Sequence, residues 1–125
     1  MEDALTWTGK WRNQYGSVLE ITDDSDGQII GSFRTALDDS GFHGQTIPMF
    51  GVHQGDCISV AGGGRTAAGD AVVSYTGLLR NGKMETLWFL VADAAIKAAA
   101  GQPGKIEKLS WWRSMTTSAD TFERI

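Results

Sequence analysis

The stretch Gly9-Lys10-Trp11-Arg12-Asn13-Gln14-Tyr15-Gly16-Ser17 decides the fold of this chain. It predicts an aromatic-rich strand that presents an amide and a hydroxyl on one face. The chain then turns at Gly16 and enters the alternating strand Val18-Leu19-Glu20-Ile21-Thr22. Polar side chains that point into a β-barrel are costly unless a partner satisfies them. The pattern therefore indicates a cavity for a ligand that is rich in hydrogen-bonding groups.

The composition is that of an ordinary globular protein. The 125 residues are 42% hydrophobic and 21% charged, so we expect a single domain over residues 1–125. The net charge is −4, and no basic cluster of the kind that follows phosphates is present, which argues against a nucleic-acid partner. No apolar run is long enough to cross a bilayer, so no membrane partner is expected.

Targeting signals and metal-binding residues are sparse. Met1-Glu2-Asp3 leads straight into polar sequence without a visible signal peptide, which fits a cytoplasmic protein or a secreted one whose leader has been removed. The single Cys57 excludes an internal disulfide. His43 and His53 lack the spacing of metal ligands, and we expect no metal site.

Sixteen glycines punctuate short runs of β-forming residues, which predicts an up-and-down β structure. The predicted strands are residues 6–13, 17–22, 28–35, 46–53, 57–61, 71–79 and 83–91, with a last strand from about 112 to 125. We expect a flexible loop at 62–69. Eight strands with hairpin connections favour an all-β, closed antiparallel barrel, because closure leaves no unpaired edge. Such a barrel has room for one small ligand.

One segment departs from the β pattern. Residues 93–100, Asp-Ala-Ala-Ile-Lys-Ala-Ala-Ala, have high helical propensity, an N-cap candidate in Asp93 and a stop at Gly101. The sequence therefore predicts a short helix in the connection before the last strand.

The run Leu87-Trp88-Phe89-Leu90-Val91 is apolar at every position. If Trp88 and Leu90 point into the barrel, Leu87, Phe89 and Val91 form an apolar outer face. Such a face needs a cover, and we expect a second subunit in a homo-oligomer, a dimer or tetramer, to supply it. The alternative is that the helical insertion covers it.

The motifs together resemble the avidin/streptavidin family of biotin-binding proteins. The resemblance is carried by residues 9–17, by Gly-Ser-Phe at 31–33, Tyr-Thr-Gly at 75–77, Thr-Leu-Trp-Phe-Leu at 86–90 and Asp-Thr-Phe at 120–122. It implies an eight-stranded barrel that binds biotin at its open end without catalysis and without a cofactor. It also suggests a secreted or extracellular location.

The resemblance implies a role for individual residues. The urea ring of biotin has one carbonyl acceptor and two N–H donors. Asn13 and Ser17 would donate to its oxygen, while Thr35 and Asp120 would accept from its nitrogens. Trp11 and Trp88 would wall the apolar part of the ligand, with Leu90 beside them. The remaining residues of the expected site are Phe33, Leu37, Asp39, Tyr75 and Trp112.

Trp112 matches a family tryptophan that can reach into a neighbouring subunit's site, although the adjacent Trp111 leaves this assignment open by one position. Other positions depart from the family. Phe33 stands where the family usually has a tyrosine that donates to the urea oxygen, and Gly62 stands where it has a further wall tryptophan. Val73 and Ala71 replace hydroxyl residues that meet the ligand's sulfur and its carboxylate.

These departures predict a site that retains the head-group contacts and alters the tail contacts. Asp38-Asp39 would repel a carboxylate unless Arg65 or another cation intervened. We therefore expect biotin binding weaker than that of the tightest family members, or a ligand with a neutral tail such as a biotin amide.

Other functions remain open at this point: a lipocalin-like barrel, an enzyme, or a barrel that serves only as an assembly module. Gly9-Lys10-Trp11 also fits the Gly-x-Trp with which lipocalins begin, so a lipocalin-like barrel for another small apolar ligand is the alternative. A lipid cup, however, should carry few inward polar groups. An enzyme needs a base within reach of a nucleophile or metal, and Asp120 is the only inward ionisable group that the pattern predicts.

Overall fold

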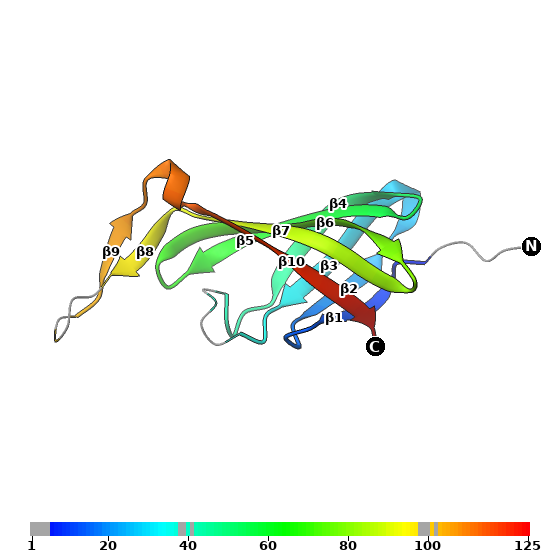
Figure 1. Ribbon diagram of the computed structural model, residues 1–125, viewed down its shortest axis with the longest axis horizontal. Helices are drawn as coiled ribbons and strands as arrows, with labels where there is room; N and C mark the ends of the chain where they lie inside the picture. Colours follow the sequence, from blue (N-terminus) through cyan, green and yellow to red (C-terminus); the bar gives the residue numbers. More distant parts are fainter. Residues whose placement is uncertain (1–5, 38–39, 41, 98–100, 102) are drawn as a thin grey trace, which may run out of the picture.

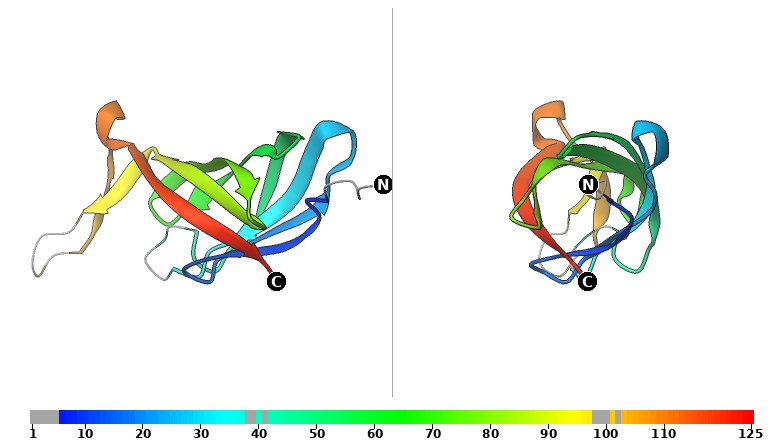
Figure 2. Two further views of the ribbon diagram at one scale, coloured as in Figure 1. Left: turned by 45° about the vertical axis from the view of Figure 1, so that its right-hand side comes forward. Right: turned by 90° about the vertical axis from the view of Figure 1, so that its right-hand side faces the viewer.

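The computed structural model describes residues 6–37, 40, 42–97, 101 and 103–125. Eight antiparallel strands close into a barrel, as predicted, and Figure 2 shows the ring end-on. They are β1 (Gly9–Asn13), β2 (Val18–Asp23), β3 (Gln28–Arg34), β4 (Ile47–Gln54), β5 (Cys57–Thr66), β6 (Gly69–Arg80), β7 (Lys83–Ala92) and β10 (Met115–Arg124). A 3-10 turn, η1 (Ser25–Gly27), joins β2 to β3.

The strands follow one another around the barrel in chain order, and the two terminal strands pair to close it. Strand β1 pairs with β10 in the register Trp11↔Arg124 to Asn13↔Phe122. Strand β10 also pairs with β7 along most of its length, from Met115↔Val91 to Glu123↔Lys83. Closure leaves none of these eight strands with an open edge.

The alternation of side chains along the strands fills the interior. In β6, for example, Ala71, Val73 and Tyr75 are buried while Val72 and Thr76 are exposed. The period of two is what a strand with one face on the core requires. The barrel interior is therefore a packed core over much of its length.

One end of the barrel is closed by aromatic side chains. Trp7 and Trp11 are fully buried with their ring centroids 6.1 Å apart, and the Trp11 indole donates to the carbonyl oxygen of Trp7 at 2.9 Å. The guanidinium of Arg124 lies 4.2 Å from the centre of the Trp11 ring, a cation–π contact. Trp7 and Trp11 thus form an aromatic plug at this end of the barrel.

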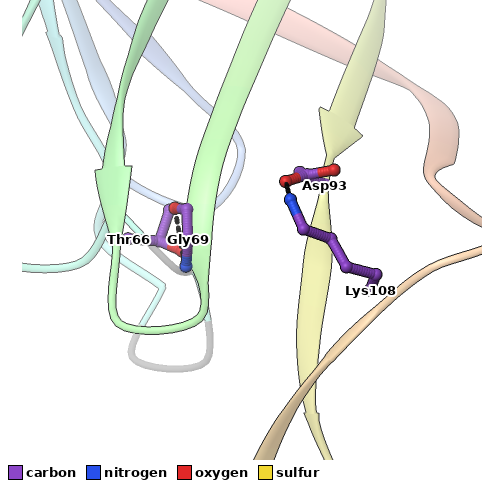
Figure 3. A network of polar contacts seen from close by, with 4 residues as sticks. All are labelled: Thr66, Gly69, Asp93 and Lys108. Carbon is purple, nitrogen blue, oxygen red and sulfur yellow. Dashed lines mark hydrogen bonds and ion pairs between the residues drawn. The ribbon is translucent and has the colours of Figure 1, made fainter.

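The loop predicted at 62–69 is wrong. Strand β5 continues through three glycines, in the register Gly62↔Val73 to Gly64↔Ala71. The turn is shorter: the Thr66 hydroxyl donates to the carbonyl oxygen of Gly69 at 2.8 Å, as Figure 3 shows. A side chain at Gly62 would meet the Met49 sulfur at 2.4 Å, so here glycine allows close packing within a strand.

The helix predicted over 93–100 is also wrong where the structure describes it. Residues Ala94–Lys97 form strand β8, which pairs with β9 (Lys105–Lys108) in a two-stranded sheet, and residues 98–100 lie outside the described residues. The helical element of this connection is instead a 3-10 turn, η2 (Trp111–Arg113), just before β10. Eight residues of high propensity make a marginal helix in isolation, and pairing with β9 outweighs it.

The β8–β9 hairpin extends β7 and β10 beyond the barrel (Figure 1). An ion pair between Lys108 and Asp93 joins its two strands where they leave the barrel (Figure 3). The hairpin leaves the outer face of β7 open: Leu87, Phe89 and Val91 are 57%, 47% and 39% exposed. No helix among the described residues is long and apolar enough to span a membrane.

Candidate functional site

A cavity of about 300 Å³ lies inside the barrel at the end where β1 finishes. The structure places many of the predicted site residues along it, from five strands and two loops. They are Asn13, Ser17, Phe33, Thr35, Leu37, Tyr75, Trp88, Leu90 and Asp120. Asn13, Ser17, Thr35 and Asp120 form one polar side of the cavity, here called the polar wall, and the rest of the lining is mainly aromatic and aliphatic. The cavity thus has the two-sided character that the sequence predicts.

Two other predicted residues, Trp11 and Trp112, do not line the cavity, and a third is not described. Trp11 lies in the plug described above, so the expectation that it walls the cavity is wrong. Trp112 is 65% exposed on η2, where its ring meets Trp111 edge to face at 6.0 Å. Asp39 lies outside the described residues.

Three residues that line the cavity were missed from the sequence: Tyr15, Ser40 and Phe42. Phe42 is only 4% exposed, although it lies in a connection rich in Asp, Ser and Gly. A side chain at Gly64 would meet its ring at 3.3 Å, so Phe42 occupies the space that this glycine of β5 leaves. A single large apolar residue in a polar loop was the signal for its burial.

The backbone fixes the orientation of Asn13 at the polar wall. Its Oδ1 accepts from the backbone N–H groups of Tyr15 at 3.1 Å and Ser17 at 2.9 Å. The amide nitrogen must then point the other way, where it donates to Oδ2 of Asp120 at 3.0 Å. One of its two hydrogens remains for another acceptor, because an amide nitrogen carries two.

Ser17 and Thr35 form the second part of the polar wall. The Ser17 oxygen accepts from the backbone N–H of Ala36 at 2.9 Å, and the Thr35 oxygen accepts from that of Leu37 at 3.1 Å. The two hydroxyl oxygens lie 3.4 Å apart, with either able to donate to the other. Each backbone N–H holds its hydroxyl oxygen in place, so both hydroxyls are positioned before any ligand arrives.

Asp120 brings a buried carboxylate to the same wall. It is 4% exposed, and Oδ1 accepts from the side-chain amide of Gln14 at 2.9 Å. Thr86, also buried, donates its hydroxyl to the Asp120 backbone oxygen at 2.8 Å and holds β10 in register with β7. A carboxylate has about four acceptor positions. The side-chain amides of Asn13 and Gln14 use two of these positions, so the carboxylate can still accept a hydrogen bond from a ligand N–H.

Tyr75 completes the polar wall from β6. Its ring packs against Phe33 at 5.4 Å and edge-on against Phe122 at 5.2 Å. Burial raises the pKa of its hydroxyl far above the ordinary value, and the negative charge of Asp120 and hydrogen bonding to that carboxylate raise it further. The phenol therefore stays protonated, as a hydrogen-bond donor, throughout the physiological range.

This environment predicts a specific loss of stability in alkali. The native state retains the Tyr75 proton, which the unfolded chain releases near the ordinary pKa of 10.0. Stability tied to the neutral phenol is therefore fully present below that pH and falls as pH rises above it, by up to about 1.4 kcal/mol per pH unit. Urea titrations of the wild type and of Tyr75→Phe above and below this pH measure the difference. Parallel pH dependences of the two proteins would contradict the assignment.

The chain matches the model of the Avidin family over residues 1–125. Among solved structures it is similar to the bradavidin2–biotin complex, with a TM-score of 0.70, 21% identity and coverage of 97% of this chain and 99% of that one. It is also similar to apo shwanavidin (TM-score 0.73, 22% identity, 100% of both chains) and to the rhizavidin–biotin complex (0.66, 23%, 96% and 92%). No curated protein matches it. Since the family model covers the whole sequence, the chain belongs to the Avidin family.

Proposed function

We propose that this protein binds biotin, or a close biotin derivative, in the barrel cavity and does not convert it chemically. The observation that carries the proposal is the convergence of Asn13, Ser17, Thr35 and Asp120 on one wall of that cavity. Family membership and the biotin complexes of bradavidin2 and rhizavidin support the same ligand. They also favour it over a lipocalin-like ligand.

The hydrogen-bonding inventory of the wall complements a cyclic urea. Asn13 retains one amide hydrogen and Ser17 one hydroxyl hydrogen, and both suit a carbonyl oxygen. Thr35 and Asp120 retain acceptor capacity for the two N–H groups. The bond to Asp120 is charge-assisted and draws electron density in the urea toward its oxygen, which strengthens the bonds at the other end.

The apolar walls suit the rest of the ligand and select against a charged tail. Trp88, Leu90 and Val73 line the cavity beyond the polar wall, together with Phe42. Among the described residues that line the cavity there is no lysine, arginine or histidine. A carboxylate that enters this lining loses hydration without gaining a cation, so affinity should be below that of the tightest family members.

Catalysis is disfavoured by the same lining. Asp120 is the only carboxylate among the described lining residues, and side-chain amides occupy it. Neither serine of the lining has a histidine or lysine beside it among those residues. The acid–base pair that hydrolysis or group transfer requires is therefore missing from this part of the cavity.

We further propose that a second copy of the chain covers the outer face of β7. Leu87, Phe89 and Val91 are exposed on this face, and Val91 lines an open groove of about 690 Å³ together with Val72, Trp111 and Met115. Segment 93–114 has four basic and two acidic residues, whereas the whole chain carries −4. This contrast favours contact between that segment and the body of another copy. Trp112 would then serve the cavity of the neighbour.

The head-group assignment is tested with Asp120→Ala. Losing a charge-assisted bond of about 1.5–3 kcal/mol should weaken biotin binding by about 10- to 150-fold. Isothermal titration and the shift in melting temperature on adding biotin measure the loss, with the exposed Ser118→Ala of the same strand as control. Unchanged affinity in Asp120→Ala would refute the site, and a wild type without any biotin-dependent shift would refute the function.

The tail assignment is tested with the wild type alone. If no cation meets the carboxylate, biotin amide should bind at least as tightly as biotin, because it enters the apolar lining without a charge. Titrating both ligands under the same buffer conditions gives the ratio. A preference of tenfold or more for the free acid, on the order of 1.4 kcal/mol, would contradict it.

The oligomer is tested by placing a charge in the proposed interface. Phe89→Glu should shift the protein to monomers, because an unpaired carboxylate at an apolar interface is costly. Light scattering coupled to size exclusion measures the mass. Thr22→Glu, an exposed change on β2, should leave it unaltered. A wild type that is monomeric at micromolar concentration would disprove this proposal.

A further inference from the structure

Two aromatic rings meet at the polar wall, and only one of them carries a hydroxyl. Phe33 comes from β3 and Tyr75 from β6, with their ring centroids 5.4 Å apart. Tyr75 is 5% exposed and held on its other side by the edge-on ring of Phe122. Packing on both sides fixes the ring, and therefore the position of the hydroxyl oxygen, before a ligand binds.

Tyr75 and Asp120 line the same cavity, and the Asp120 carboxylate, which Asn13 and Gln14 contact, is near enough to raise the pKa of the Tyr75 hydroxyl. Asp120 is the group that would accept an N–H of the urea. In a cyclic urea that N–H and the carbonyl oxygen are borne by adjacent atoms of one planar unit. A donor that lines the cavity near Asp120, as Asn13 and Tyr75 do, is therefore within reach of the carbonyl oxygen as well.

We propose that Tyr75 is a specificity-determining residue whose hydroxyl donates to the carbonyl oxygen of the ligand, as a third donor next to Asn13 and Ser17. This inference rests on the proposed function. Phe33 cannot fill the role, because its ring has no hydrogen-bonding group. The third donor is therefore the Tyr75 hydroxyl on β6, and the Tyr75 ring packs against the ring of Phe33 on β3.

Three donors on one oxygen favour a ligand whose oxygen can carry negative charge. Asp120 accepts from the N–H and polarises the urea, while the three donors stabilise the charge that collects on the oxygen. Sulfur in the same position is a much weaker acceptor. Tyr75 should therefore contribute to discrimination between a urea and a thiourea, and contribute little to the binding of the apolar part.

The test compares Tyr75→Phe with the wild type, using biotin and the biotin analogue in which sulfur replaces the urea oxygen. The variant loses one oxygen atom and keeps the ring contacts. Biotin affinity should fall by about tenfold, as expected for one buried hydrogen bond, while affinity for the thiourea should change less than about threefold. Thr76→Val is the control, because it removes a hydroxyl from an exposed position of the same strand that does not line the cavity.

The outcomes separate this inference from the function beneath it. If the wild type binds neither ligand, the proposed function fails. If the wild type binds biotin and Tyr75→Phe binds both ligands as before, or loses both equally, the role of Tyr75 is refuted while the function stands.

A crystal structure of the wild type with biotin provides a measurement that does not depend on the variant folding. A distance of about 3.2 Å or less from the Tyr75 hydroxyl to the urea oxygen supports the assignment. A hydroxyl that contacts Asp120 alone overturns it.

Discussion

The pairing of β1 with β10 is the constraint on which the rest of this structure depends. It joins the two ends of the described chain, closes the barrel and leaves no open edge among its eight strands. The same pairing brings Asn13 within 3.0 Å of Asp120, although 107 residues separate them in the sequence. Fold closure and assembly of the polar wall are therefore one event, and a change in this register would disrupt both.

Burying the side chains of the polar wall costs free energy. The protein limits this cost because most of their hydrogen bonds are made to other groups of the same chain. Backbone N–H groups engage Asn13, Ser17 and Thr35, and amide side chains engage Asp120. A buried polar group without a partner would cost on the order of 1–3 kcal/mol. The hydrogen-bonding capacity that remains is directed into the cavity, so a complementary ligand finds oriented partners and need not reorganise them.

The departures from the sequence predictions share one cause. High helical propensity at 93–100 and three consecutive glycines at 62–64 are local signals, whereas strand pairing with a distant segment decides both regions. Gly62 and Gly64 leave volume that Met49 and Phe42 occupy, which no periodicity within β5 could indicate. Local preference ranks conformations of a short segment, and packing against the rest of the chain selects among them.

By itself the sequence determined the all-β barrel and most of its strands, since alternation and turn residues act over a few positions. It also indicated which residues the family resemblance assigns to a urea. The inward direction of Trp88 and Leu90 was only a condition at that point, because the run 87–91 is apolar at every position, and the structure places both residues along the cavity. Only the tertiary structure decided that Trp11 packs with Trp7 at one end of the barrel, that Phe42 lines the cavity and that the Asp120 carboxylate raises the pKa of the Tyr75 hydroxyl. Each of these placements involves a segment from elsewhere in the chain, such as Arg124 against Trp11 and Gly64 against Phe42. Barrel geometry sets the distance between such side chains, and no local spacing encodes it.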